Sequence, residues 1–475
     1  MRGPQIKTLK QHSMAYNLYM FEAANAGSQY YSVDEKNKIL TLGMMVDKNK
    51  QYRLGKLINY NELTETKAIN FQIPLKRGEK SQIKRLLRVD DNTFLFYKTV
   101  SKTKEALYAI PVDSSYGISG SPLKIEECAR DFEETHIVSS SDKKSILIVK
   151  MDTHDTGNDM SGMTFDETHI KCSMRDAKLN VVWSVEYYLP VAPRGCAPED
   201  IFIDNDRNLY MICYNGLNND QRATLFQYYW KSKKWMTTPL GRADAKIQGC
   251  TFKMLNAITP VVAGIYSIGK HEGYFIMRGE PADMMFKEVA TKPFLGFQMW
   301  NGIVPANQYR VSKIVTTDNG NTTVSIEGSN ALDGGKFLFS NVYLFQIEPD
   351  GKEVWHGVVE KKQAITYLSN AGGHALFTKG NDIIVLYNDD HVNSKQPPGS
   401  KNIFEYSGPR TDHVLQRFDV TGKATKQIVT TAGNGLDLGI SVQTLIPVED
   451  NVYHVQLWHM RTDMLGFAFG TLTIN

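Results

Sequence analysis

The chain has 475 residues, and its 54 Lys and Arg against 51 Asp and Glu leave a formal charge of only +3. This balance gives no overall field for attracting nucleic acid or an anionic membrane, and 42% hydrophobic with 22% charged residues excludes wholesale disorder. Five cysteines cannot staple a disulfide-dense scaffold, and no apolar run approaches the ~18–20 residues of a membrane-spanning helix. We therefore expect no nucleic-acid partner and no transmembrane segment.

The predicted elements are short strands from end to end, because no segment of a dozen or more residues shows helical periodicity. Eight times, a strand-like run passes through a polar turn into a strongly apolar run. These hairpins span residues 30–42, 85–97, 136–149, 200–212, 249–264, 311–326, 374–386 and 443–455. A second hairpin usually follows, as at 225–234, 343–352 and 415–423. Each repeat therefore contains about four strands.

The turns of the eight hairpins recur every 52 to 70 residues, which is the length that four antiparallel strands and their loops need. A single four-stranded sheet cannot bury both of its faces, so repeated sheets must stack on one another. The sequence predicts an all-β fold, a β-propeller with seven or eight four-stranded antiparallel blades. We expect a single domain over residues 1–475, with the ring closed by an N-terminal strand within residues 6–20 that pairs with the C-terminal blade.

Two tandem β-sandwiches are the alternative architecture, and they would require a linker in the middle of the chain. The most linker-like stretch, residues 393–410, is rich in Pro, Ser, Gly and Lys but lies between strands of one repeat. We interpret it as a long blade loop, and residues 151–168 as a second one.

Serine-hydrolase motifs are absent from the sequence. The two Gly-x-Ser tripeptides, Gly117-Ile118-Ser119 and Gly439-Ile440-Ser441, lack the second glycine of a nucleophile elbow and precede no helical pattern. The chain also has no room for a helical hydrolase domain. We expect no serine-hydrolase chemistry on these grounds.

Metal sites are weakly indicated. Residues 152–159 gather three carboxylates and a histidine, but their spacing is not that of an EF-hand. Residues 388–391 (Asn-Asp-Asp-His) and 204–208 (Asp-Asn-Asp-Arg-Asn) are further acidic turns, and such turns are also the ordinary connection of hairpins. We expect solvated loops, with no metal site and no cofactor.

Aromatic and basic residues are interleaved at 226–235, and a basic run covers 76–85. Aromatic residues beside lysines can stack on bases or sugars. With a net charge of +3, we interpret the first as a hairpin whose aromatic residues pack between blades.

Three stretches resemble a family of uncharacterised secreted proteins and lipoproteins from Gram-negative Bacteroidetes. They are residues 262–275, residues 347–363 and residues 386–393, and the resemblance runs over roughly 134–393. Glu360 stands where that family has proline, and the usual export signal is not present here. The family brings no established activity. The resemblance implies an exported β-propeller-like protein, in the periplasm or associated with the outer membrane.

The resemblance also singles out a group of polar residues at strand ends of neighbouring repeats. The candidate ligand-binding residues are Glu327, Lys361, Lys362, Gln363, Asn388, Asp389 and Asn393. They could converge on one face of the ring to bind a ligand, or form a hydrogen-bonded belt that fixes the register of the blades.

Three functions remain open at this point. The first is a non-catalytic binding or scaffold propeller at the cell envelope, which holds a protein, peptide or glycan. The second is a carbohydrate-active propeller enzyme with Glu327 and Asp389 as acid/base groups, which requires an open cleft with carboxylates roughly 5–10 Å apart. The third is a structural subunit of a larger envelope assembly. We favour the first function and expect no catalytic residues.

Overall fold

The computed structural model describes most of the chain beyond residue 80 and isolated strands before it. The described residues are 5–8, 29–34, 39–45, 51–59, 64–65, 69–72, 80–112, 120–129, 134–151, 168–190, 196–215, 222–255, 259–269, 271–280, 285–294, 309–332, 336–366, 372–400, 403–407, 410–430, 438–442, 445–449, 452–459 and 467–474. They belong to two compact units: residues 17–239, which we call the N-terminal unit, and residues 1–16 with 240–475, the C-terminal unit. No helix in these residues is long and apolar enough to cross a membrane.

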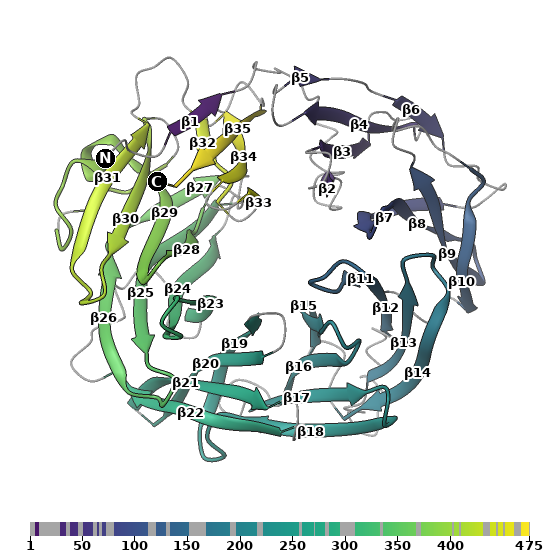
Figure 1. The fold of residues 1–475 in the computed structure, drawn as a ribbon, viewed down its shortest axis with the longest axis horizontal. Helices are drawn as coiled ribbons and strands as arrows, with labels where there is room; N and C mark the ends of the chain where they lie inside the picture. Colours follow the sequence, from purple (N-terminus) through teal and green to yellow (C-terminus); the bar gives the residue numbers. More distant parts are fainter. Residues whose placement is uncertain are drawn as a thin grey trace. The chain divides into compact units, whose positions relative to one another are not determined.

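The N-terminal unit contains four antiparallel sheets in chain order (Figure 1). The first consists of β2 (Gln29–Asp34), β3 (Ile39–Met45), β4 (Gln51–Asn59), β5 (Thr64–Glu65) and β6 (Ile69–Gln72). The second consists of β7 (Lys80–Val89), β8 (Asn92–Val100), β9 (Lys104–Val112) and β10 (Leu123–Ala129). The third consists of β11 (Glu134–Ser139), β12 (Ser145–Met151), β13 (Thr168–Asp176) and β14 (Val181–Leu189). The fourth consists of β15 (Cys196–Ile203), β16 (Leu209–Asn215), β17 (Arg222–Tyr229) and β18 (Lys234–Leu240).

The C-terminal unit holds the other four sheets of the described residues. The first consists of β19 (Lys246–Leu255), β20 (Thr259–Ile268), β21 (His271–Glu280) and β22 (Met285–Pro293). The second consists of β23 (Tyr309–Thr316), β24 (Thr322–Leu332), β25 (Lys336–Ile347), β26 (Glu353–Val359) and β27 (Gln363–Thr366). The third consists of β28 (Ala375–Lys379), β29 (Asp382–Asp390), β30 (Thr411–Phe418) and β31 (Ala424–Thr430), with the short helix α2 (His391–Ser394) after β29. The last combines β32 (Leu438–Ile440), β33 (Ile446–Glu449), β34 (Val452–His459) and β35 (Phe467–Thr473) with β1 (Gln5–Thr8).

The two runs of all eight predicted hairpins pair as antiparallel strands. In seven sheets they are the first two strands, whereas in the last sheet β32 and β33 both pair with β34. In three sheets one strand position is shared by two short segments, as where β26 and β27 both pair with β25. Strand β1 pairs antiparallel with β35. The organisation of residues 1–475 as a single domain stays a prediction.

The apolar cores lie between successive sheets of each unit. One core joins Val261 and Tyr274 of the first C-terminal sheet to Val324 and Phe345 of the second. Further cores join the second sheet to the third, and the third to the last. Two equivalent cores separate the last three sheets of the N-terminal unit. Four-stranded antiparallel sheets that pack face to face in chain order are the blades of a β-propeller, so the predicted fold class is confirmed.

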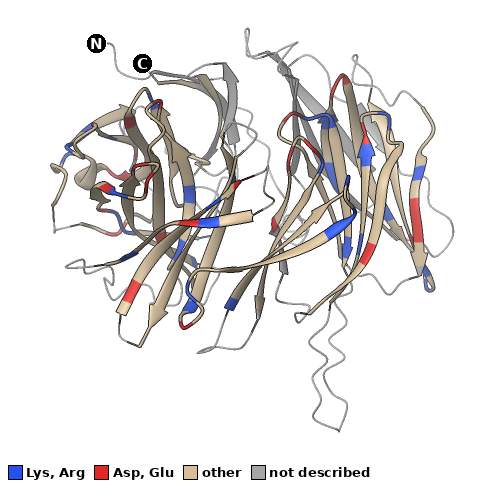
Figure 2. Cartoon of the chain, turned by 60° about the horizontal axis from the view of Figure 1, so that its bottom comes forward, with Lys and Arg blue, Asp and Glu red and all other residues tan. Residues whose placement is uncertain are grey.

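The hairpin at 226–235 packs as expected between two blades. Trp235 stacks on Tyr187 of the preceding sheet, with ring centroids 4.3 Å apart, and contacts Tyr228 beside it. Charged residues of both signs are interspersed along the described strands (Figure 2).

Candidate functional site

A break in an outer strand position buries a lysine. Strands β26 and β27 pair with successive stretches of β25, and Glu360, Lys361 and Lys362 connect them. At this break Asn341 Oδ1 accepts the backbone N–H of Lys361 at 3.1 Å, and the side chain of Lys361 is fully buried. Its Nζ lies 5.5 Å from the centroid of the Phe339 ring. A buried ammonium group needs an anionic partner.

Glu327 of β24 supplies that partner. Its Oε1 forms an ion pair with Lys361 Nζ, and its Oε2 accepts the Nδ1–H of His374 at 3.0 Å. Burial by itself would raise the pKa of Glu327, but the charge of Lys361 and the hydrogen bonds with Lys361 and His374 outweigh it and bring the pKa to about 2. Glu327 is therefore a carboxylate at neutral pH. This state excludes it as a general acid there.

His374 is held by the backbone that leads into β28. Gly373 has a φ of +82°, which favours glycine, and its N–H donates to Gln363 Oε1 at 2.9 Å. A side chain on Gly372 would meet the Phe339 ring at 2.0 Å. Burial lowers the pKa of His374 despite the neighbouring Glu327, so the imidazole is neutral at neutral pH. Its Nδ1–H then donates to Glu327, and its Nε2 is an acceptor.

Two hydroxyl groups face that acceptor. Ser325 Oγ lies 2.9 Å from His374 Nε2, and Ser312 Oγ lies 3.3 Å from the same nitrogen. The two hydroxyl oxygens are 3.3 Å apart. Glu327, His374 and the two serines thus form one chain of polar contacts that crosses from β23 and β24 to the start of β28.

Gln363 joins this group to the next sheet. Its Oε1 accepts from Lys361 Nζ at 2.9 Å, and its Nε2 donates to the backbone carbonyl of Asn388 at 2.6 Å. The Asn388 side chain in turn exchanges two hydrogen bonds with the backbone of Ile440, at 2.7 and 2.9 Å. Three successive sheets are therefore tied by side chains of the predicted set.

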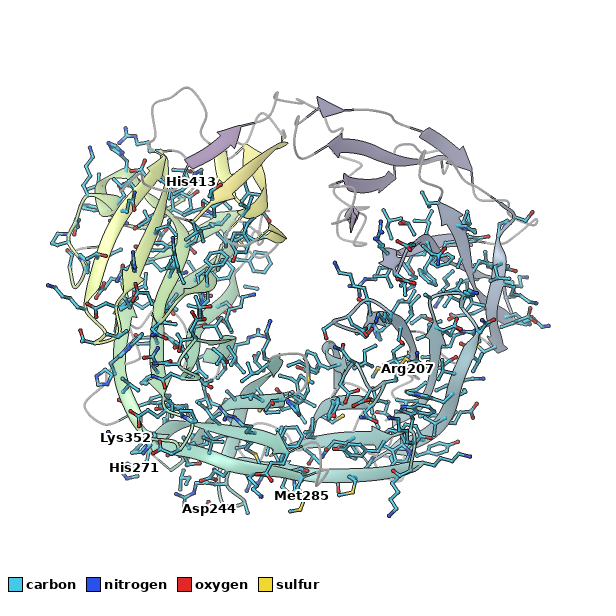
Figure 3. The ribbon with its side chains drawn as sticks, viewed as in Figure 1. Arg207, Asp244, His271, Met285, Lys352 and His413 are labelled. Atoms are coloured by element: carbon cyan, nitrogen blue, oxygen red, sulfur yellow. The ribbon has the colours of Figure 1, made fainter. Side chains whose placement is uncertain are left out.

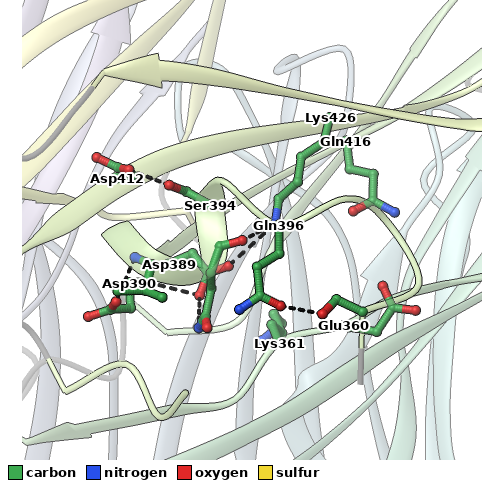
Figure 4. A network of polar contacts seen from close by, with 12 residues as sticks. Glu360, Lys361, Asp389, Asp390, Ser394, Gln396, Asp412, Gln416 and Lys426 are labelled. Carbon is green, nitrogen blue, oxygen red and sulfur yellow. Dashed lines mark hydrogen bonds and ion pairs between the residues drawn. The ribbon is translucent and has the colours of Figure 1, made fainter. Parts of the chain in front are cut away.

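A second polar group surrounds α2 (Figure 4). Asp389 Oδ1 accepts from Asn393 Nδ2 at 2.8 Å, and Asn393 also binds the backbone of Phe404. Lys426 Nζ donates to the Asn393 carbonyl at 2.8 Å and lies 3.9 Å from Asp389 Oδ2. Burial raises the pKa of Asp389 to about 6, although Asn393 and Lys426 oppose this. This group fixes the first part of the long loop after β29.

The acidic run 388–391 does not converge on a metal. Asp390 caps α2 by accepting from the Val392 N–H at 2.8 Å, and His391 Nδ1 lies 3.0 Å from Asp412 Oδ2. Asp204 similarly closes its own turn by accepting from the Asn208 N–H at 2.8 Å. Among the residues that the structure describes, no cluster of His, Cys, Asp and Glu could hold a metal ion. The acidic run at 152–159 lies outside them.

The structure gathers six of the seven predicted site residues into the two groups. Lys362 lies apart, because it is partly exposed and pairs with Glu405 at 3.3 Å. Sequence reasoning missed Ser312, Ser325, His374 and Lys426 as members. They come from four different strands or strand ends, and no local motif marks any of them.

A comparable buried cluster exists in the N-terminal unit. Glu105 of β9 forms an ion pair with Lys98 and lies 3.7 Å from Lys150 Nζ, and its Oε1 accepts from Thr135 at 3.0 Å. Lys150 Nζ also lies 2.9 Å from Cys128 Sγ. Glu105, Lys98 and Lys150 are all buried. No sequence motif marks this cluster.

Comparisons with known proteins bear on the fold. A scan of protein-family models found no match. A search of curated proteins found none either.

Solved structures similar to the chain include the WD40 domain of SCAP from fission yeast, with 9% identity, 99% of this chain and 94% of that chain covered, and a TM-score of 0.44. The β-propeller domain of the Trilobed protease from Pyrococcus furiosus matches at 10% identity, with 86% and 97% covered and a TM-score of 0.37. An oligogalacturonate lyase from Vibrio parahaemolyticus matches at 9% identity, with 82% and 95% covered and a TM-score of 0.39. No function is carried over from likenesses of this degree.

Proposed function

We propose that the chain is a binding propeller of the bacterial cell envelope that holds a partner along an open strand edge. The observation that carries this proposal is the free edge of β14, the last strand of its sheet. Among the described strands, none pairs with its free edge. The free edge of a strand presents unpaired N–H and C=O groups to any extended chain that approaches it.

The composition of β14 supports a binding role. Its nine residues, VVWSVEYYL, include one charged residue and no proline. Val181 is 55% exposed and Tyr188 is 61% exposed, and Tyr188 stacks on His169 with centroids 4.5 Å apart. Proteins usually protect such edges with charges and proline. The edge strand β22 is protected in this way, because it carries Lys287, Glu288, Lys292 and Pro293.

The hydrogen bonds within the two polar groups argue against a partner that binds at the predicted site residues. The Gln363 side chain hydrogen-bonds the backbone of Gly373 and of Asn388, and the Asn388 side chain hydrogen-bonds the backbone of Ile440 in the next sheet, as expected of a belt that fixes blade register. The carbohydrate-active alternative assigned acid/base roles to Glu327 and Asp389. Its acid cannot be Glu327, whose pKa of about 2 keeps it ionised.

Of the possible partners, an extended segment of another protein fits an open strand edge best, because its main chain can add a strand to the sheet. The envelope location rests on the sequence resemblance alone. Fractionation of the native bacterium tests it, with recovery in the periplasmic or outer-membrane fraction as the expected result. Recovery in the cytosol would contradict it.

Site-specific photo-crosslinking in the native host tests the binding role. A benzoylphenylalanine at position 188 should give one discrete crosslinked species. The matched control is the same residue at position 285, because Met285 is 51% exposed and lies on the protected edge strand β22, where it points away from the sheet (Figure 3). Tyr188→Lys together with Val181→Lys should abolish complex formation, whereas Met285→Lys should not. Equal crosslinking at both positions, or none, would refute the edge as the binding surface.

The structural-subunit alternative predicts a different result. A subunit of a large assembly should crosslink from several sheets to several proteins. A single species from β14 would favour the binding role.

A further inference from the structure

We propose that Ser312, His374 and Glu327 form a nucleophile, base and orienting carboxylate that hydrolyse carboxylic esters. This activity goes beyond the proposed binding role and does not depend on it, because β14 lies in the other unit. The diagnostic arrangement for such chemistry is a nucleophile within hydrogen-bond reach of a base that a third group orients.

The distances satisfy this arrangement. Ser312 Oγ lies 3.3 Å from His374 Nε2, and His374 Nδ1 lies 3.0 Å from Glu327 Oε2. Hydrogen bonds of this kind are often long before substrate binds. Strands β23 and β28, which begin neighbouring sheets, bring Ser312 and His374 together across the sheet boundary.

The backbone at Ser312 is specialised. The register between β23 and β24 shifts between Val311 and Lys313, so Ser312 is the extra residue of a β-bulge. Bulges re-aim a side chain out of the regular alternation of a strand and are frequent beside active sites. Here the bulge directs a hydroxyl group toward an imidazole of the next sheet.

The protonation states are those that the chemistry requires. Glu327 is ionised and His374 is neutral at neutral pH. A neutral imidazole that donates Nδ1–H to a carboxylate has its Nε2 lone pair free to take a proton from a serine. Lys361 balances the charge of Glu327 on its other oxygen.

Of the two serines near Nε2, we assign Ser312 as the nucleophile. Ser325 is completely buried, whereas Ser312 is partly exposed and is therefore the better placed of the two to meet an ester. Ser325 lies 2.9 Å from Nε2 and 3.3 Å from Ser312 Oγ, and it is a positioning residue.

The surroundings indicate an anionic ester. Lys313 follows Ser312 directly, and its pKa is lowered by burial and by the nearby Lys253 of β19, with Glu327 opposing. Lys253 is exposed, as is Arg310 of β23. Cations on neighbouring strands favour a substrate that carries a carboxylate or a similar negative group.

The reaction balances without a further reagent. Ser312 Oγ bonds to the ester carbonyl carbon while its proton passes to His374 Nε2. The bond from that carbon to the alcohol oxygen then breaks, and the proton on Nε2 passes to the leaving alcohol. Water next attacks the acyl-serine, gives its proton to Nε2 and releases the acid, and the proton returns to Ser312. The net change is ester and water to acid and alcohol.

The experiment uses the full chain and a fluorophosphonate probe, followed by peptide mass spectrometry. We expect one adduct, on Ser312, and hydrolysis of mono-p-nitrophenyl succinate faster than of p-nitrophenyl acetate. Ser312→Ala should abolish the adduct and lower ester turnover at least 100-fold. Ser232→Ala, in the β17–β18 turn, is the matched control and should change neither.

Glu327 acts through His374, so its test needs a readout beyond rate. Glu327→Gln should move the midpoint of the pH profile of probe labelling to lower pH, because a neutral neighbour stabilises the imidazolium less. Circular dichroism checks that each variant is folded. If Glu327→Gln does not fold, the Ser312→Ala variant still decides the test. A folded wild-type chain that acquires no adduct, an adduct on Ser325 instead, or equal turnover by Ser312→Ala would overturn the proposal.

Discussion

Each unit buries one glutamate among cations, but the two clusters differ in what surrounds the carboxylate. Glu105 lies between Lys98 and Lys150, with Thr135 as its hydrogen-bond donor. Glu327 lies between one lysine, Lys361, and one histidine, His374. The first cluster holds two lysines and one glutamate. The second holds one ion pair and a neutral imidazole.

This difference separates a structural cluster from one with chemical capacity. The Glu105 cluster contains lysines, a threonine and a carboxylate but no imidazole. The Nε2 acceptor of His374 lies within hydrogen-bond distance of two hydroxyl groups. Both clusters tie sheets together, yet only the second sets an imidazole against serine hydroxyl groups.

The largest loss of stability is expected at Glu105. Glu105→Gln leaves Lys98 and Lys150 buried without their anion, and removing one partner from a buried ion cluster costs about 3–5 kcal/mol. With two cations stranded, we expect about 5 kcal/mol, measured by urea unfolding. Lys287→Gln, which breaks an exposed pair with Glu280, is the control and should cost less than about 0.5 kcal/mol. A loss at Glu105 no greater than the control would show that these charges are solvated.

Glu327→Gln should cost less, about 3 kcal/mol in the same measurement. Only Lys361 is stranded, and burial already lowers its pKa, so it can release its proton once Glu327 is neutralised. The double change Glu327→Gln with Lys361→Met should restore part of the loss. If Glu327→Gln destabilises more than Glu105→Gln, the comparison is wrong.

The pH dependence should show opposite signs for two carboxyl groups of the C-terminal unit. Glu327 has a folded pKa of about 2, below its ordinary value of 4.5, so its contribution is present above pH 4.5 and is lost as the pH falls toward 2. Asp389 has a folded pKa of about 6, above its ordinary 3.8, so its contribution is present below pH 3.8 and is lost as the pH rises through 6.

Asp389→Asn isolates the second of these effects. Between pH 4 and 6 the variant should lack the fall in stability that Asp389 causes in the wild type, which is at most about 1.4 kcal/mol per pH unit for one proton. Above pH 7 it should be at least as stable as the wild type, because the amide buries no charge. Unfolding curves at four pH values measure this. An unchanged slope would place the titration on another group.

The smallest effect is expected at Tyr387, whose buried hydroxyl group has no hydrogen-bond partner among the residues that the structure describes. Tyr387→Phe removes a hydroxyl group whose burial costs desolvation free energy that no hydrogen bond offsets. Stability should therefore stay the same or rise by up to about 1 kcal/mol in thermal or urea unfolding. A clear loss would reveal a partner for this hydroxyl group.

The strand pattern of this protein was predictable because it is local. Polar turns such as Asp90-Asp91-Asn92 and Asp318-Asn319-Gly320-Asn321 separate apolar runs, and each becomes the tight connection of a hairpin. Stacking of the repeats follows from the two apolar faces of each sheet. The convergence of Glu327, Lys361, Gln363, Asn388 and Asp389 was also foreseeable in outline, since they end neighbouring strands.

The partners of those residues were not predictable. His374 meets Glu327 across 47 positions, and Ser312 meets His374 across 62. Both contacts depend on details that the pattern of apolar residues does not encode, namely a one-residue bulge at Ser312 and a glycine turn at Gly373.

The sequence by itself therefore determined which segments are strands, where they turn and that they stack as repeats. Only the tertiary structure decided that Lys361 is buried, that burial raises the pKa of Asp389 and that a serine, a histidine and a glutamate lie in line. The physical reason is range. Backbone hydrogen bonds and apolar alternation act between near neighbours, whereas the environment of a buried charge is set by side chains from several sheets.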